Sequence, residues 1–224
     1  MSLFLYATEF PEPLPPAQFK PLLALLPEVL QKRVLKYRRW EDGHASLMGK
    51  LLLRLALENG GYPSDLSRLR YSEWEKPGLP GGPEFNITHS GNRAVCMLNP
   101  HGRIGIDIEF LKPRSFEDFK DHFTQKEWTA IGTAPEPLDV FYRFWTAKES
   151  LIKADGRGLD IPLQGIDVSE GGTFLLDGQV WTGCGLPIYK GYAFHITVEG
   201  TDPPPIKYQD LTPGRLLGLS RGWM

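Results

Sequence analysis

The sequence has few cysteines, no long apolar segment and no recognisable leader. Cys96 and Cys184 are the only cysteines in 224 residues, and without CxxC or Cys/His spacing they support neither a disulfide framework nor a zinc knuckle. No stretch approaches 18 apolar residues, so the sequence predicts no membrane span. The N-terminus lacks the basic region of a signal peptide, and its apolar run is too short for one. We therefore expect a cytoplasmic protein with no membrane partner.

The chain also lacks an excess of charge of either sign. Its 25 Lys and Arg residues nearly balance 27 Asp and Glu residues, whereas general nucleic-acid binders are strongly basic, so we expect no nucleic-acid partner. The 24 glycines and 20 prolines are many, but they stay below the roughly 25–30% typical of low-complexity disorder. An aromatic content of 12% favours a packed core. A chain of this length can form one large domain or two small ones.

Hydrophobic spacing indicates two halves built on a similar plan. It predicts helices over residues 44–58 and 138–154, each followed by a Gly- or Pro-rich connection and then by strands. We therefore predict an α+β fold, a pseudo-dimer of two similar α+β halves that bury a shared face. A coincidental repeat within one α+β domain is the alternative. The expected division is an N-terminal half at 1–103, a C-terminal half at 104–202 and a tail at 203–224.

Shorter patterns predict the remaining elements. We expect further helices over residues 17–26, 28–40 and 124–131. Strands are expected over residues 3–7, 85–88, 94–98, 103–110, 166–168, 173–176, 179–181 and 192–198. The tail is predicted to be irregular and then to form a short helix.

Acidic residues in two distant segments form the main candidate site. In the predicted strand 103–110, side chains alternate between faces, so Asp107 and Glu109 project together, opposite three isoleucines. Two close carboxylates repel each other, and a cation removes that cost. In the predicted helix 138–154, Glu149 and Lys153 are i, i+4 neighbours in the favourable order. An acidic set without Cys or a clear His ligand suits Mg²⁺ or Mn²⁺ rather than zinc. The alternative is a solvated face on each element.

Positive charge is concentrated near the N-terminus. Residues 17–54 contain eight basic and three acidic residues, a balance that indicates an anion site. The small size of this segment favours a compact polyphosphate over a long polymer, and a solvated basic face is the alternative. The turn at residues 86–91 offers a hydroxyl, the imidazole of His89 and open backbone N–H groups, which can bind phosphate. Taken alone, His89 also fits a structural histidine.

Three of these segments together resemble the Sfp-type 4′-phosphopantetheinyl transferases. They are Phe85-Asn-Ile-Thr-His-Ser-Gly91, Gly105-Ile-Asp-Ile-Glu109 and Trp145-Thr-Ala-Lys-Glu-Ser-Leu-Ile-Lys153, followed by Gly156-Arg-Gly-Leu159. Their order and spacing agree with the family, and weaker likeness extends from about residue 27 to residue 200. The resemblance implies the fold of that family and transfer of the phosphopantetheine arm of coenzyme A to a serine of an apo carrier protein. It further implies an acyl, polyketide or peptidyl carrier and the release of adenosine 3′,5′-bisphosphate.

The resemblance implies catalytic and metal-binding roles. Asp107, Glu109 and Glu149 would hold Mg²⁺, with Mn²⁺ as the alternative, against the pyrophosphate of coenzyme A. Glu149 also counts among the catalytic residues. Lys153 would neutralise charge on the α-phosphate and on the departing nucleotide. Glu127 matches a suspected base that would take the proton of the carrier serine, directly or through water.

Other positions match residues that bind the nucleotide and its phosphates in the family. They are Arg33, Ser46, Lys76, Thr88, His89 and Lys153. Family members carry further basic residues where this chain has Leu30 and Gln31, so part of the 3′-phosphate contact must come from elsewhere, with Arg38 or Arg39 as candidates. By this reading, a cleft between the halves holds the nucleotide on its basic N-terminal side and the metal on its C-terminal side. A monomer is expected, since one chain supplies both sides.

Two other functions use the same features. A Mg²⁺-dependent phosphohydrolase would use the same acids with water as the nucleophile. A binding module would hold nucleotides or single-stranded RNA through residues 31–40 and would not need the acidic residues.

Overall fold

The structure is a computed structural model that describes residues 2–220. By their internal contacts these residues form two compact units. Unit 1 comprises the described parts of Met1–Tyr71, Pro77–Pro100 and Pro205–Met224, and unit 2 comprises Ser72–Lys76 and His101–Pro204. Each helix in the described range is too short or too polar to span a bilayer.

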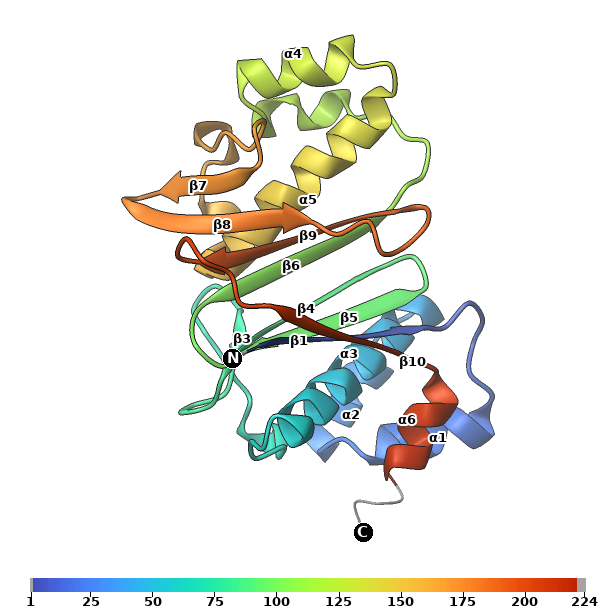
Figure 1. Ribbon diagram of the computed structural model, residues 1–224. Helices are drawn as coiled ribbons and strands as arrows, with labels where there is room; N and C mark the ends of the chain where they lie inside the picture. Colours follow the sequence, from blue (N-terminus) through green and yellow to red (C-terminus); the bar gives the residue numbers. More distant parts are fainter. Residues whose placement is uncertain (1, 221–224) are drawn as a thin grey trace. The chain divides into compact units, whose positions relative to one another are not determined.

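Unit 1 is a four-stranded sheet with helices packed on it (Figure 1). The strand order is β10-β1-β5-β4, in which β1 runs parallel to β10 and antiparallel to β5. The strands are β1 (Leu3–Glu9), β4 (Glu84–Ser90), β5 (Arg93–Asn99) and β10 (Ile206–Leu211). The helices are α1 (Pro16–Ala24), α2 (Glu28–Leu35), α3 (Trp40–Asn59), η1 (Leu66–Arg68) and α6 (Pro213–Ser220), and a short ladder pairs β2 (Arg70–Tyr71) with β3 (Pro77–Gly78).

Helix α3 is the central helix of unit 1 and packs on β1, β4 and β5. Its leucines at i, i+4 spacing are buried, as the periodicity predicts. Gly61 adopts a positive φ just after the helix, a conformation that glycine reaches without steric cost. At Gly49 a side chain would lie 2.6 Å from Cγ2 of Ile87, so the glycine permits a close approach of α3 to β4.

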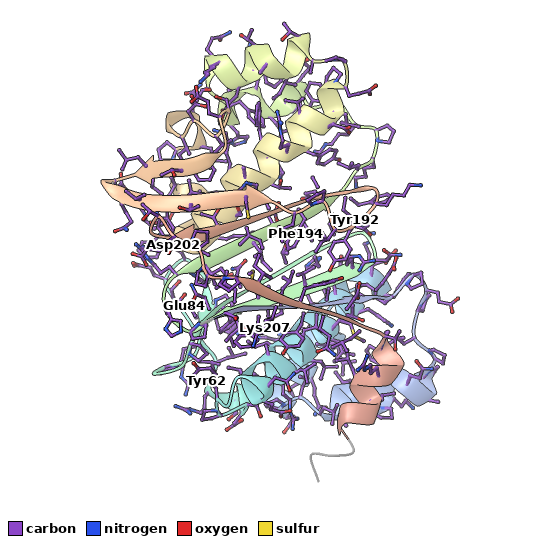
Figure 2. The ribbon with its side chains drawn as sticks, viewed as in Figure 1. Tyr62, Glu84, Tyr192, Phe194, Asp202 and Lys207 are labelled. Carbon is purple, nitrogen blue, oxygen red and sulfur yellow. The ribbon has the colours of Figure 1, made fainter. Side chains whose placement is uncertain are left out.

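Unit 2 is an antiparallel sheet of order β6-β9-β8-β7 covered by helix α5. Its strands are β6 (Ile104–Phe110), β7 (Gly172–Leu176), β8 (Gln179–Gly185) and β9 (Tyr192–Glu199). The helices are η2 (Glu117–His122), α4 (Gln125–Thr133), α5 (Pro137–Asp155), η3 (Gly158–Asp160) and η4 (Leu163–Gly165). Ring contacts join Phe110, Tyr189, Tyr192 and Phe194. Tyr192 and Phe194 lie on β9 (Figure 2).

The two units repeat one topology. In unit 1, β1 is followed by the long helix α3 and by the antiparallel pair β4 and β5, and β5 pairs with β1. In unit 2, β6 is followed by the long helix α5, and the antiparallel pair β8 and β9 ends in a strand that pairs with β6. The predicted α+β class with two similar halves is confirmed by this repeat.

Two of the predicted local elements are wrong. The helix expected over residues 28–40 ends at Leu35, and α3 begins at Trp40. The intervening charged segment offers only Tyr37 for burial, and that side chain is half exposed. The strand expected over residues 166–168 does not form, because the N–H of Val168 donates to the carboxylate of Glu127 and not to a neighbouring strand.

The segment predicted to be an irregular tail also differs in the structure. In place of irregular structure it supplies β10, which pairs with β1 along six residues; the short helix predicted after it is confirmed as α6, which packs on α1. Leu211 and Leu216 are buried in the core of unit 1. The strand forms because it satisfies the backbone groups along one edge of β1, a gain that the polar sequence of β10 does not reveal.

Candidate functional site

The acidic residues of β6 face helix α5. Side chains alternate along the strand, so Gly105, Asp107 and Glu109 share one face. A side chain at Gly105 would collide with the carbonyl oxygen of Ser150 and the amide nitrogen of Ala154, which identifies this face as the one that α5 covers. The glycine therefore allows α5 to lie close to β6, beside both carboxylates.

Lys153 connects the two segments. Its Nζ donates a hydrogen bond to Oδ1 of Asp107 at 2.5 Å and lies 3.8 Å from Oε2 of Glu149. Asp107 is buried, whereas Lys153 and Glu149 are partly exposed. The structure thus brings together three of the residues that the sequence singled out, from elements more than 40 positions apart.

The charges of this cluster influence one another. Burial raises the pKa of Glu149; the Lys153 ammonium opposes this, and the charges of Asp107 and Glu109 add to it. Burial acts to lower the pKa of Lys153, but the charges of Asp107, Glu149 and Glu109 prevail and raise it. Three carboxylates therefore act on the Lys153 ammonium, and they also repel one another.

The donor set fits a hard divalent cation. Within residues 2–220 no group of three or more His, Cys, Asp and Glu side chains is arranged to hold a metal ion. The cluster nevertheless offers several carboxylate oxygens close to one another. Mg²⁺ commonly takes one or two carboxylates and completes its shell with water and substrate phosphates. Two of the three carboxylates already contact a common cation, the ammonium of Lys153.

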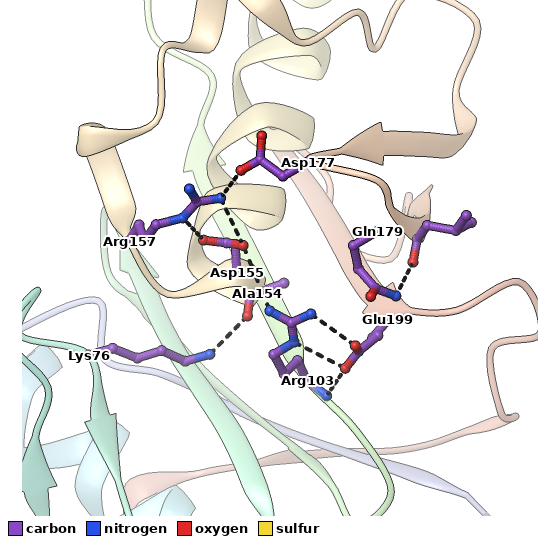
Figure 3. Close-up of polar contacts among 9 residues, drawn as sticks. Lys76, Arg103, Ala154, Asp155, Arg157, Asp177, Gln179 and Glu199 are labelled. Carbon is purple, nitrogen blue, oxygen red and sulfur yellow. Dashed lines mark hydrogen bonds and ion pairs between the residues drawn. The ribbon is translucent and has the colours of Figure 1, made fainter.

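Ion pairs fix the end of helix α5, which carries Lys153 (Figure 3). Arg103 pairs with Glu199 at 2.9 Å and lies 3.7 Å from Asp155. Arg157 pairs with Asp155 at 2.6 Å, and Gly156 ends the helix with a φ of 104°. These contacts restrain the last turn of α5, and they thereby help to fix the position of Lys153.

Lys76 also contacts this helix end. Its Nζ donates to the carbonyl oxygen of Ala154 at 3.0 Å (Figure 3). Lys76 belongs to unit 2 by its contacts, although its neighbours in sequence on both sides of 72–76 belong to unit 1. The ammonium of Lys76 therefore lies at Ala154, the residue that follows Lys153 in the chain.

Glu127 lies in a closed environment. The side chain is fully buried in the capping box of α4, where one oxygen accepts the N–H of Thr124 and the other that of Val168, each at 2.8 Å. It also forms an ion pair with Lys148 at 2.9 Å, and both side chains have no exposed surface. In this conformation a carrier serine has no access to the carboxylate, so its role as the base stays a prediction.

The residues predicted to bind the nucleotide are only partly brought together. Ser46 and His89 line one pocket of unit 1, and the guanidinium of Arg33 lies 4.3 Å from the centre of the Tyr71 ring, which lines the same pocket. Thr88 lies on the opposite face of β4 from His89 and is buried.

Leu30 and Gln31 contribute no charge here. Leu30 is buried, and the amide of Gln31 donates to the carbonyl oxygen of Leu26. Arg39 is exposed and lies 3.6 Å from Glu41, and Arg38 is exposed. The pocket contains instead Lys50, which sequence reasoning missed. Its position four residues after Ser46 on a predicted helix was the signal that could have found it.

Comparison with known proteins relates the chain to one family. A family model described as the 4′-phosphopantetheinyl transferase superfamily matches residues 103–188. The chain is 33% identical over 182 residues to the 4′-phosphopantetheinyl transferase Sfp of Bacillus subtilis (strain 168), with 79% of each chain covered. A second 4′-phosphopantetheinyl transferase of Bacillus subtilis is 31% identical and is covered over 75% of its length and 73% of this chain. The L-aminoadipate-semialdehyde dehydrogenase-phosphopantetheinyl transferase of Mus musculus is 34% identical, with 67% of this chain and 55% of that protein covered.

Proposed function

This chain belongs to the Sfp-type 4′-phosphopantetheinyl transferases, and we propose that its β6–α5 site holds Mg²⁺ and the pyrophosphate of coenzyme A. The enzyme transfers the 4′-phosphopantetheine moiety of coenzyme A to a serine of an apo carrier protein and releases adenosine 3′,5′-bisphosphate. One observation carries the assignment of the site. The ammonium of Lys153 lies 2.5 Å from Asp107 and 3.8 Å from Glu149, and the charges of Asp107 and Glu109 act on Glu149.

Asp107, Glu109 and Glu149 would hold the metal ion. When bound, the ion supplies positive charge beside the pyrophosphate, which stabilises the negative charge that develops during transfer. A divalent cation also balances the repulsion among the three carboxylates, so binding of the ion and of the anionic substrate support each other.

Lys153 acts on the leaving nucleotide. Its pKa is raised by the surrounding carboxylates, so the side chain stays protonated throughout the neutral range. The serine oxygen forms a bond to the phosphorus that carries the pantetheine arm, and the bond from that phosphorus to the bridging oxygen breaks. The departing adenosine 3′,5′-bisphosphate takes the electron pair, and the Lys153 ammonium donates a hydrogen bond to its phosphate.

The proton of the serine must pass to a base. By the family resemblance Glu127 takes this proton, directly or through water. Both oxygens of Glu127 already accept hydrogen bonds, and its charge is paired with Lys148. Proton transfer to Glu127 therefore requires this buried arrangement to open.

For unit 1 we propose that the adenosine end of coenzyme A is bound by Arg33, Ser46 and His89. The pocket combines apolar and aromatic walls with polar side chains, which suits a purine nucleotide. The family pattern also implies Thr88 and Lys76 as phosphate ligands; neither lines this pocket. We further propose that the enzyme acts as a monomer, since one chain supplies both kinds of site.

The test is a transfer assay on several apo carriers. Enzyme, coenzyme A and Mg²⁺ are incubated with acyl, polyketide and peptidyl carriers, and each carrier is weighed by mass spectrometry. A mass gain equal to one phosphopantetheine arm is expected on at least one carrier. Cleavage of coenzyme A without any carrier would indicate a phosphohydrolase instead. Replacing the carrier serine with alanine provides the control.

A further inference from the structure

Lys50 is a half-buried cation of helix α3 with an unusual set of neighbours. Its Nζ donates to Oγ of Ser46 at 2.7 Å and to the Ser46 carbonyl oxygen at 3.1 Å. Within residues 2–220, no carboxylate forms an ion pair with it. The charged group that acts on Lys50 is the guanidinium of Arg33, which repels it. A half-buried cation that a second cation repels, and that no carboxylate pairs with in the described residues, favours the binding of an anion.

The surroundings indicate what kind of anion fits. Lys50, Ser46 and His89 line a pocket of about 210 Å³ in unit 1. Its other walls are apolar or aromatic and comprise Tyr37, Ala45, Leu53, Leu69, Tyr71, Pro77, Phe85 and Ile87. The pocket is smaller than the roughly 300–1,000 Å³ of a site for a whole drug-sized ligand, so it fits one end of a larger molecule. An aromatic base carrying a nearby phosphate matches these walls and charges.

The local sequence explains how the pocket is built. Ser46 and Lys50 are separated by four residues and so share one face of α3. Ile87 and His89 alternate with buried residues along β4 and so share one face of that strand. Gly49 lets α3 approach β4 closely, which brings these two faces to the same pocket.

We infer that Lys50 binds the 3′-phosphate of coenzyme A and is the residue by which this enzyme distinguishes coenzyme A from its 3′-dephospho form. The inference rests on the proposed placement of the adenosine end in the pocket of unit 1. Lys50 supplies the charge that Leu30 and Gln31 do not supply, and it does so from a different helix.

The charge of Lys50 also makes nucleotide binding depend on pH. Burial, and then the charge of Arg33, lowers the pKa of Lys50 to about 8. The other titratable or charged groups of the pocket are Arg33 on α2, Tyr37, Tyr71 on β2 and His89 on β4. A loss of affinity at alkaline pH that Lys50→Arg removes therefore reports on Lys50.

The experiment compares two nucleotides that differ by the 3′-phosphate. Binding of adenosine 3′,5′-bisphosphate and of adenosine 5′-phosphate to the full chain is measured by calorimetry at pH 7. Variants are Lys50→Met, Lys50→Arg and, as the matched control, Lys20→Met, which removes an exposed charge of α1. Circular dichroism melts establish that the variants fold.

Lys50→Met is expected to weaken binding of the 3′,5′-bisphosphate about 10–100-fold, the size of one charge-assisted hydrogen bond. Binding of adenosine 5′-phosphate should change less than about threefold. Lys50→Arg should retain most of the preference for the 3′,5′-bisphosphate over adenosine 5′-phosphate. Lys20→Met should bind both nucleotides as the wild type does. In the transfer assay, Lys50→Met should lose preference for coenzyme A over dephospho-coenzyme A through KM.

Two outcomes separate the inference from the proposed function. If the Lys50→Met enzyme still modifies a carrier and prefers coenzyme A as strongly as the wild type does, the inference is overturned and the proposed function stands. A wild-type protein that discriminates the two nucleotides through Lys50, yet modifies no carrier, supports the inference and overturns the proposed function.

Discussion

Glu127→Gln removes one charge of the buried pair with Lys148, and we expect it to lower the free energy of unfolding by about 3–5 kcal/mol. Both side chains have no exposed surface and their charged atoms lie 2.9 Å apart. The variant would leave a buried ammonium without a counter-charge, and one amide N–H of Thr124 or Val168 would face the new NH₂ group. Lys148 keeps the carbonyl oxygens of Leu163 and Ile166 as acceptors, which limits the loss.

Urea denaturation followed by circular dichroism measures this loss. The matched control is Lys126→Met on the same helix, which breaks an exposed pair with Glu170 and should cost no more than about 1 kcal/mol. A loss as small for Glu127→Gln as for Lys126→Met would refute the reasoning, because it would mean that the buried charge carries no desolvation penalty.

The double variant Glu127→Gln, Lys148→Met separates the structural role of Glu127 from its role as the base. Removing both charges should recover a large part of the lost stability, since a buried ion pair is often replaced at little cost. If Glu127 takes the serine proton, the stable double variant should still lose about 10²–10⁴-fold in kcat. An unchanged kcat would leave Glu127 with its structural role alone.

Four further predictions concern the site, the pocket and the fold. Asp107→Asn and Glu149→Gln should each lower transfer at least about 100-fold without loss of fold, whereas Glu117→Gln, outside the acidic cluster, should leave the rate unchanged; this is checked by initial rates and thermal melts. A chelator should abolish transfer, and Mg²⁺ should raise the melting temperature of the wild type but not of Asp107→Asn, as differential scanning fluorimetry would detect. Because Lys50 is charged below its pKa of about 8 and loses that charge above it, affinity for adenosine 3′,5′-bisphosphate should fall as pH rises from 7 to 9, and Lys50→Arg should flatten this dependence in calorimetry. Gly105→Ala should destabilise the protein by at least about 1–3 kcal/mol in urea titrations because its side chain meets the backbone of α5, whereas Gly165→Ala, with open space around it, should be nearly neutral.

Elements with strong periodicity were predicted well. The leucine spacing of α3 and the apolar spacing of α5 predict which residues are buried, because a helix buries one face and its residues return to that face at a fixed period. The alternation in β6 likewise placed Asp107 and Glu109 on one face, which the close contact at Gly105 identifies as the face toward α5. Local patterns of this kind depend on neighbours within a few residues, so the sequence contains them.

Pairing between distant segments was not predictable in the same way. The polar strand β10 exists because β1 presents an edge, and its own residues show little of this. Glu127 has a local capping sequence, yet its ion pair with Lys148 depends on how α4 meets α5. Lys50 lines the same pocket as His89 only because Gly49 lets α3 lie close to β4.

From the sequence alone came the chemical inventory of the protein: which carboxylates, lysines and histidine stand in motifs, and which helix or strand face each occupies. Tertiary structure alone decided which of these groups share a site. It joined Lys153 and Glu149, which already share one helix face, to Asp107, closed Glu127 away from solvent, and added Lys50 to the pocket with His89. The physical reason is that charge interactions act over a few ångströms in space, and residues far apart in the chain reach that separation only when packed elements bring them together.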